Sequence, residues 1–153
     1  MIISAQDIPM ERVIKPSSQF ISFKIDIDQL VWNFGIASFK TVLPNVLDLH
    51  DSAYEIALTQ LICLGKSSKP QVLDIGLDLI NLSPLDGVMF PLLYRTLLKK
   101  GNSCFQPLIR NYFLTTHKSI STLCLYLRLS DFQTESFEGE QLLITLELRK
   151  CPH

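Results

Sequence analysis

Alternation of apolar and polar residues, repeated in four separate stretches, is the feature that most limits how this chain can fold. Residues 20–28 read Phe-Ile-Ser-Phe-Lys-Ile-Asp-Ile-Asp, and similar patterns return at residues 73–79, 122–129 and 144–149. Successive side chains of a β-strand point to opposite faces, so alternation gathers the apolar residues of each stretch on one face. Each stretch therefore predicts a strand with one buried and one solvent-facing side.

Four less regular apolar runs bring the expected number of strands to eight. They span residues 34–43, 54–63, 90–98 and 105–113. Turn-forming residues separate the runs, for example at Pro44-Asn45, residues 65–70 and residues 83–87. No long amphipathic helix competes for these residues, although a short helical turn is expected at residues 28–34 or around residues 97–100.

Eight strands with one buried face each predict an all-β fold, a single jelly-roll β-sandwich of about eight antiparallel strands. An immunoglobulin-like sandwich is the alternative, but Trp32 precedes all four cysteines, so its Cys-Trp-Cys arrangement is missing. The sandwich is expected over residues 19–150, after an N-terminal arm or flexible tail at residues 1–18 and before a C-terminal tail at residues 151–153. The expected shared core contains Phe23, Ile25, Ile56, Leu58, Leu125, Leu127, Ile144 and Leu146.

Composition agrees with one folded domain and argues against several classes of partner. Hydrophobic residues make up 47% of the chain and charged residues 19%, which is enough apolar surface to offset the entropy of ordering. The 14 basic and 15 acidic residues are scattered, so no specific nucleic-acid binding is expected. The apolar runs are too short to span a bilayer, and the first twenty residues lack the organisation of a secretory signal. We expect synthesis in the cell interior, in the cytoplasm or nucleus, without secretion.

No set of reactive side chains points to catalysis. The histidines, at positions 50, 117 and 153, lack the spacing of metal ligands. Carboxylates that alternate along predicted strands are what the solvent side of any sheet contains; the ones considered are Asp26, Asp28, Asp74 and Asp78. We therefore predict that the chain is not an enzyme and has no catalytic residues, no metal site and no cofactor.

The four cysteines include no closely spaced pair. They are Cys63, Cys104, Cys124 and Cys151, and three of them fall within or beside apolar strand-like runs. This distribution predicts free thiols rather than structural disulfides.

Residues 39–61 carry a resemblance to a known family. They read Phe-Lys-Thr-Val-Leu-Pro-Asn-Val-Leu-Asp-Leu-His-Asp-Ser-Ala-Tyr-Glu-Ile-Ala-Leu-Thr-Gln-Leu. This resembles the penton-like minor capsid proteins of polintons (Mavericks), adintoviruses and their relatives. In that family a strand ending in a Leu-Pro-like element leads through a Leu-rich connector to an aromatic-Glu-Val-Ala-Leu segment, and residues 54–58 stand at that place.

Two later pieces follow in the family's order. Residues 91–95, Pro-Leu-Leu-Tyr-Arg, and residues 105–112, Phe-Gln-Pro-Leu-Ile-Arg-Asn-Tyr, resemble a Pro-Leu-Leu-Arg element and the strand after it. Residues 120–149 resemble the family's ending, a Phe-x-x-Gly element before a terminal Val-Thr-Leu-x-Phe-Arg-like strand. Departures are Tyr54, where tryptophan is common, and Leu148, where an aromatic residue is common. The turn at residues 130–135 also departs from an Asp-x-x-Gly pattern.

The resemblance implies a structural role in a virion. It implies a single jelly roll that forms a homopentamer, occupies the vertex of an icosahedral capsid as its penton, and contacts a major capsid protein. An alternative from another class is a non-viral or domesticated β-sandwich binding module, which would be a monomer or dimer with an exposed ligand surface. A cupin-like enzyme on the same fold would need a histidine-rich metal cluster, which the sequence does not supply.

Overall fold

The chain is a β-sandwich in the computed structural model, which describes residues 12–14, 16, 18–33, 36–65, 71–85, 87–98, 103–105, 107, 110–129 and 139–152. Sheet A contains β1 (Arg12–Ile14), β3 (Val31–Asn33), β4 (Ile36–Asp48), β6 (Gln71–Leu77), β9 (Leu92–Leu98) and β12 (Ser119–Leu129). Sheet B contains β2 (Ser18–Asp26), β5 (Tyr54–Gly65), β10 (Ser103–Phe105), β11 (Phe113–Leu114) and β13 (Gly139–Lys150). A separate hairpin consists of β7 (Ser83–Leu85) and β8 (Val88–Phe90), and a short 3-10 helix, η1, spans Ile27–Gln29.

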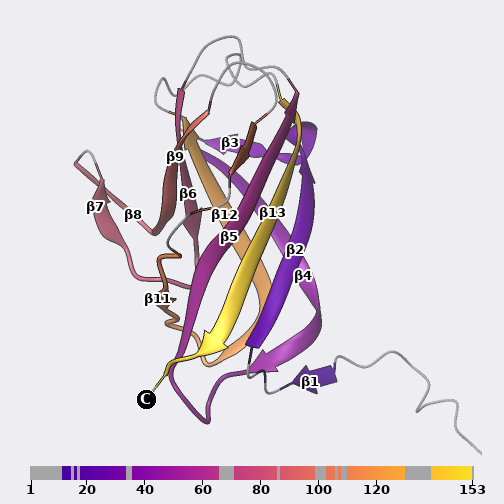
Figure 1. The fold of residues 1–153 in the computed structure, drawn as a ribbon, viewed down its shortest axis with the longest axis vertical. Coiled ribbons are helices and arrows are strands. Elements are labelled where there is room, and N and C mark those ends of the chain that lie inside the picture. Colours follow the sequence, from indigo (N-terminus) through magenta and orange to yellow (C-terminus); the bar gives the residue numbers. More distant parts are fainter. Residues whose placement is uncertain are drawn as a thin grey trace, which may run out of the picture.

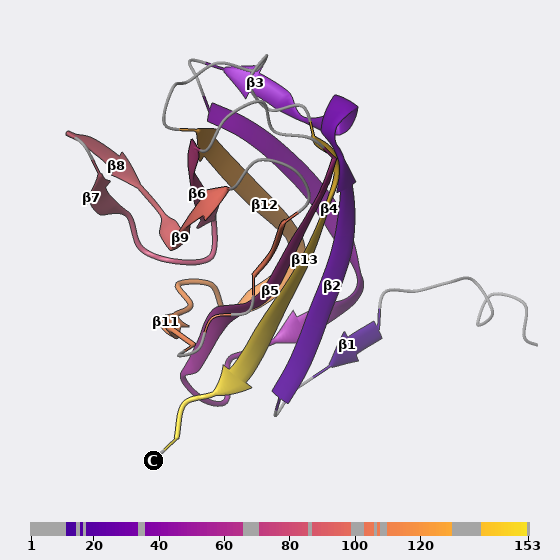
Figure 2. The same cartoon turned by 45° about the horizontal axis from the view of Figure 1, so that its top comes forward.

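The strand order is that of a jelly roll. Sheet A runs β4-β12-β6-β9, and sheet B runs β2-β13-β5, with β10 and β11 along the other side of β5 (Figures 1 and 2). The antiparallel partners nest along the chain, β2 with β13, β4 with β12, β5 with β10 and β11, and β6 with β9. This is one long antiparallel hairpin wrapped into two sheets, so the predicted fold class is confirmed.

The core lies between the two sheets and contains the residues that alternation placed there. In sheet B, Ile25 pairs with Leu142 and Phe23 with Ile144. All eight expected core residues except Phe23 are buried. The Phe23 side chain is half-buried and stacks on Phe39, with 6.2 Å between ring centroids. The predicted core is confirmed.

Some expected strand limits were wrong. Residues 105–113 do not form one strand, because β10 ends at Phe105, β11 begins at Phe113, and the described residues between them are not in a sheet. Pro107 lies in this interval and has no N–H for a ladder. The expected turn at residues 83–87 instead contains β7 and the bend of the β7–β8 hairpin. The helical turn expected near residues 28–34 is η1, one residue earlier, whereas Leu97 and Leu98 belong to β9.

The expectation of a turn at Pro44-Asn45 was also wrong, because β4 continues through these two residues. The β4–β12 register passes from Val42 opposite Thr122 to Leu47 opposite Ile120, so residues 43–46 bulge away from β12. A bulge accommodates Pro44, which cannot donate a ladder hydrogen bond. On its other side the bulged stretch pairs in parallel with β1, with Arg12 opposite Asn45.

Candidate assembly surfaces

Three of the side chains first considered as reactive groups, Asp74, Asp78 and His50, take part in structural contacts, and His153 lies outside the described residues. Asp74 accepts two hydrogen bonds from Arg95, at 2.6 Å from Nε and 3.1 Å from Nη2. The backbone N–H of Cys124 donates to Asp78 Oδ1 at 3.2 Å. The exposed His50 has its Nδ1 2.7 Å from Asp48 Oδ1. Within the described ranges, no group of three or more histidine, cysteine or acidic side chains is arranged to hold a metal ion.

Asp74 is not on the solvent side that the alternation predicts for it. Its exposed fraction is 3%, and that of the neighbouring Arg128 is 7%. Arg128 Nη1 donates to the Leu85 carbonyl oxygen at 3.4 Å, which ties β12 to the β7–β8 hairpin. The hairpin thus covers part of the outer face of sheet A. The alternation of apolar and polar residues along the strands does not predict this cover.

Three distant pieces of the sequence meet on the outer face of sheet B. Arg149 Nε donates to Glu55 Oε1 at 2.7 Å, and the Arg149 guanidinium carbon lies 3.5 Å from the centroid of the Tyr112 ring. The Tyr112 hydroxyl donates to Glu147, which Arg110 Nη1 also contacts at 3.3 Å. The hydrogen bond to Glu55 raises the pKa of the Arg149 guanidinium. The three pieces of the family resemblance therefore each contribute one residue, Glu55, Tyr112 or Arg149, to a single group of contacts. We call this group the fastening cluster.

The buried Tyr54 holds the segment that leads into β2, the first strand of sheet B. The Tyr54 hydroxyl donates to the Pro16 carbonyl oxygen at 2.7 Å and lies 3.1 Å from Asp51 Oδ1. Burial, together with the Asp51 carboxylate, raises the pKa of Tyr54 to about 12. Lys150 Nζ in turn lies 3.2 Å from Asp51 Oδ2, so the connection between β1 and β2 is tied to the end of β13.

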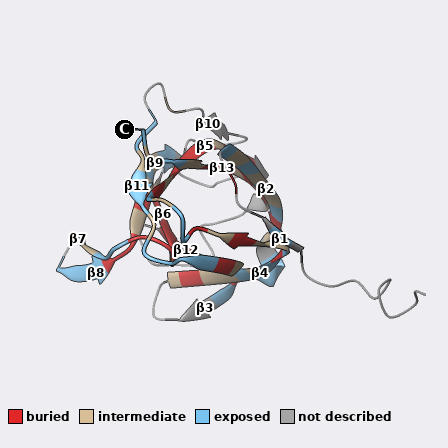
Figure 3. Cartoon of the chain, turned by 90° about the horizontal axis from the view of Figure 1, so that it is seen from below, coloured by how far each residue is buried: buried red, intermediate tan, exposed pale blue. Residues whose placement is uncertain are grey.

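Exposed large apolar side chains are confined to the two opposite edges of the sandwich. Among the described residues they lie on β1, β2, β3 and β4 at one edge, and on β8, β9, β11 and the residue before β7 at the other. None of the residues of β5, β6, β12 and β13 whose exposure is described belongs to this set. Figure 3 looks along the sandwich and shows β1 on one side and the β7–β8 hairpin on the opposite side. The residues are Val13, Phe20, Val31 and Val42 at the first edge, and Leu82, Val88, Met89, Leu97, Phe113 and Leu114 at the second.

The first edge contains a small cavity between β2 and β4, which we call the edge hollow. Its volume is about 170 Å³, and its apolar lining consists of Phe20, Ile21, Leu43, Pro44 and Leu47. The hollow opens where the Pro44 bulge separates β4 from β12. Phe20 and Val42 are 56% and 67% exposed, so apolar side chains surround it on the surface.

The opposite edge contains the β7–β8 hairpin, which projects from the sandwich (Figures 1 and 2). Gly87 has a φ of 81°, a left-handed conformation that glycine adopts without steric cost and that closes the turn. At the base of the hairpin, Phe90 is buried against Gly76, where an added Cβ would lie 2.8 Å from Phe90 Cζ. At its tip, Val88 and Met89 are 51% and 55% exposed.

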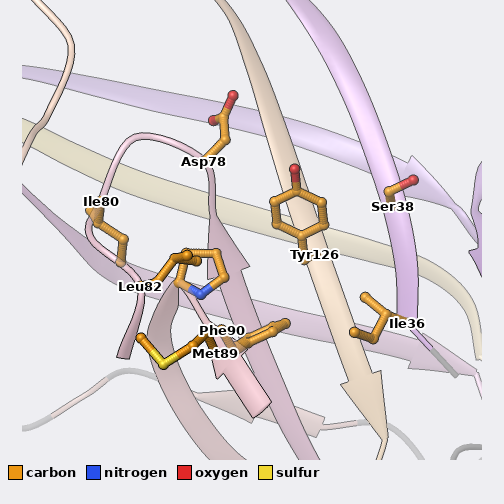
Figure 4. A pocket seen from close by; sticks show the side chains of 9 residues that line it. Ile36, Ser38, Asp78, Ile80, Leu82, Met89, Phe90 and Tyr126 are labelled. Atoms are coloured by element: carbon orange, nitrogen blue, oxygen red, sulfur yellow. The ribbon is translucent and has the colours of Figure 1, made fainter. Parts of the chain in front are cut away.

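A larger groove lies between the hairpin and the outer face of sheet A. Figure 4 shows its lining, which includes Ile36 on β4, Tyr126 on β12, and Met89 and Phe90 on the hairpin. Its volume is about 580 Å³. A hydrogen bond to Cys124 and burial raise the pKa of Tyr126 to about 12. The polar residues of its lining are Ser38, Asp78 and Tyr126, and the others are apolar.

Sequence reasoning missed both edge surfaces. Phe20 was a visible signal, because it stands on the polar side of an otherwise regular alternation with Ser22 and Lys24. Val88 and Met89 were a second signal, because an apolar pair follows Asp-Gly, a favoured hairpin turn. Neither signal says which edge a residue will occupy, since that depends on how the strands pair.

No helix in the described part of the chain is long and apolar enough to cross a membrane. Comparison of the sequence with known protein families gives no match. Comparison with curated proteins gives none either.

Comparison with solved structures gives several weak matches. The core of Drosophila NLP, described for its pentamer formation and histone binding, is 14% identical over 88% of this chain and 99% of its own, with a TM-score of 0.41. The xylan-binding CBM22-1 domain of Paenibacillus barcinonensis Xyn10C is 12% identical over 86% and 94%, with a TM-score of 0.35. The virus-like particle of the Macrobrachium rosenbergii extra small virus contains a chain 8% identical over 94% and 87%, with a TM-score of 0.30. The strand order of this chain itself is that of a jelly roll.

Proposed function

We propose that this chain is the penton (vertex) minor capsid protein of an element of the polinton, Maverick or adintovirus type. It is a structural virion protein that forms a homopentamer and joins a major capsid protein, and it is not an enzyme. The observation that carries the proposal is that, among the residues whose exposure the structure describes, the exposed large apolar side chains lie at two opposite edges of one jelly roll.

Two different apolar edges favour a ring. A contact that uses the same surface on both partners makes a twofold dimer, whereas a contact between two different surfaces is head-to-tail and closes into a ring when the rotation allows it. The two edges of this chain have different shapes, one with a projecting hairpin and one with a hollow. An edge-to-edge contact would remove both sets of apolar side chains from water.

The expectation of five subunits, and of a major capsid protein as their partner, comes from the sequence resemblance. The fastening cluster of Glu55, Tyr112 and Arg149 supports the resemblance, because these residues belong to separate quoted pieces and contact one another. These contacts stabilise the fold of the subunit. The proposal places the protein in the virion capsid, after synthesis in the cytoplasm or nucleus of the host cell.

Native mass spectrometry and sedimentation over a range of concentrations test the proposal. The chain is measured alone and together with the major capsid protein of the same element. We expect a closed species of five subunits, formed by the chain itself or on addition of the major capsid protein. A chain that stays monomeric and does not bind the major capsid protein would contradict the proposal and favour the β-sandwich binding module.

A further inference from the structure

We propose that the groove between the β7–β8 hairpin and sheet A binds a small organic cation, an amine with an apolar or aromatic body, and that the charged group of this ligand lies beside Asp78. The groove belongs to a single chain. The inference therefore goes beyond the proposed function and does not depend on assembly.

The charge in the groove is a carboxylate without a basic partner. Among the described residues of the lining, Asp78 alone carries a formal charge. Its carboxylate accepts a hydrogen bond from the Cys124 N–H, and no basic side chain of the described residues contacts it. The carboxylates of Glu55, Asp74 and Glu147, by contrast, each contact an arginine. A carboxylate that lies among apolar side chains and lacks a cation is complementary to a positively charged ligand.

The position of this carboxylate is fixed before a ligand arrives. The Asp78 N–H donates to the Cys124 carbonyl oxygen at 3.1 Å, and the Cys124 N–H donates to Asp78 Oδ1 at 3.2 Å. These two hydrogen bonds hold the residue that follows β6 against β12. Within the described part of the chain, Asp78 Oδ2 has no hydrogen-bond donor. A carboxylate held in this way loses little freedom when its second oxygen accepts a hydrogen bond from a ligand.

An aromatic ring contributes to the same part of the groove. Tyr126 follows Cys124 by two positions on β12, so both side chains are on the outer face of sheet A. A hydrogen bond to Cys124 and burial are the main causes of the raised pKa of Tyr126, about 12, and the negative charge of Asp78 adds to them. The Asp78 carboxylate is therefore close enough to act on this phenol. The face of an aromatic ring attracts cations, so Tyr126 and Asp78 favour the same kind of ligand.

Apolar side chains form the remainder of the groove. Figure 4 shows the Asp78 carboxylate and the Tyr126 hydroxyl in the upper part of the view, with Met89 and Phe90 below them. The volume of about 580 Å³ falls within the range of about 300–1,000 Å³ that is usual for small-molecule sites. A ligand with a charged group at one end and an apolar body at the other matches both parts of this lining.

Three probes of similar size separate the contribution of charge from that of shape. 2-Phenylethylamine is positively charged at neutral pH, 2-phenylethanol is neutral, and 3-phenylpropanoate is negatively charged. Isothermal titration of the native chain should show the amine binding about fivefold or more tightly than the alcohol, and no binding of the propanoate. Added salt should weaken the amine and leave the alcohol unchanged. In NMR spectra the amine should shift the amide signals of Cys124 and Tyr126.

Matched variants identify the carboxylate. Asp78→Asn keeps an oxygen for the Cys124 N–H but removes the charge, and it should lower the affinity for the amine about fivefold while leaving that for the alcohol unchanged. Tyr126→Leu should weaken the amine as well. Asp28→Asn removes the same charge at an exposed position outside the groove and should change neither affinity. Thermal unfolding of each variant confirms that it is folded.

Several results would overturn the inference. They are a native chain that does not bind the amine, equal affinities for the amine and the alcohol, unchanged binding of the amine by Asp78→Asn, and an equal loss in Asp28→Asn. Each of these results leaves the proposed function in place, because the number of subunits is measured separately.

Discussion

The Arg149 guanidinium carbon lies 3.5 Å from the centroid of the Tyr112 ring. This contact holds β13, the last strand in the chain, against the segment that leads into β11. On its other side Arg149 donates to Glu55 of β5. The contact therefore joins two neighbouring strands to a segment that belongs to neither.

Two substitutions of Tyr112 separate the contributions of its hydroxyl and its ring. Tyr112→Phe removes the donor to the buried Glu147 and should lower the free energy of unfolding by about 1–3 kcal/mol. Tyr112→Leu also removes the ring beneath Arg149 and should lower it further. Urea unfolding measures both variants. Equal stability of the Phe and Leu variants would show that the ring contact contributes nothing.

Leu127 tests the predicted core. Its side chain is 2% exposed, and Leu127→Ala should lower the free energy of unfolding by about 2–5 kcal/mol through lost burial and a residual cavity. The control is Val31→Ala, at a position 65% exposed, which should change stability by at most about 0.5 kcal/mol. A denaturant midpoint of Leu127→Ala equal to that of the native chain would contradict the placement of this residue.

Gly76 tests the anchor of the projecting hairpin. Gly76→Ala places a Cβ 2.8 Å from Phe90 Cζ and 3.0 Å from the Pro91 carbonyl oxygen, and should cost about 1–3 kcal/mol through overpacking. Adding Phe90→Leu should recover part of that loss, because the two side chains compete for one space. Gly87→Ala is the matched control, since its cost of about 1–2 kcal/mol comes from a left-handed backbone conformation in open space. Phe90→Leu should not relieve that cost.

The buried thiol of Cys63 makes stability fall in alkaline solution. Burial raises the pKa of Cys63 from 9.0 to about 11, so the folded state holds the thiol proton more tightly than the unfolded state. This contribution is complete below pH 9 and is lost as the pH rises towards 11, with a slope of up to about 1.4 kcal/mol per pH unit. Urea unfolding under reducing conditions at pH 8, 9 and 10 should show the fall.

Two variants identify the titrating group. Cys63→Ala should lose most of the slope between pH 9 and 10, although it is less stable at pH 7. Tyr54→Phe should keep that slope, because the pKa of Tyr54 moves from 10.0 to about 12 and affects stability only at higher pH. An unchanged slope in Cys63→Ala would assign the effect to another group.

The cysteines are expected to be unpaired. Cys63, Cys124 and Cys151 are free thiols in the structure, while the side chain of Cys104 lies outside the described residues. Thiol titration of freshly purified protein under denaturing, non-reducing conditions should count four. Two stable disulfides would indicate secretion and weaken the capsid proposal.

The strands and the core could be predicted from the sequence because alternation encodes which face of a strand is buried. Ile25, Leu125 and Ile144 show this, since each lies on the apolar side of its stretch and is buried. The same pattern cannot say which strands pair. The buried Asp74 is held by Arg95 of the neighbouring β9, a partner that no local pattern around residue 74 contains.

The candidate surfaces were less predictable than the core for the same reason. The Pro44 bulge shapes the edge hollow, but a proline between two apolar runs predicts a turn as readily as a bulge. The contact between Glu55, Tyr112 and Arg149 joins residues 37 to 94 positions apart. Only the completed strand order brings them together.

The position of β13 sets the order in which this chain can acquire its structure. The strand lies between β2 and β5, and its Ile144 pairs with Phe23, more than a hundred residues earlier in the chain. Until β13 emerges from the ribosome, β2 has no strand beside it in sheet B and no strand joins it to β5. Such non-local pairing makes folding slow and exposes nascent chains to aggregation. We therefore expect production of this protein to depend on chaperones that protect the chain until its last strand is made.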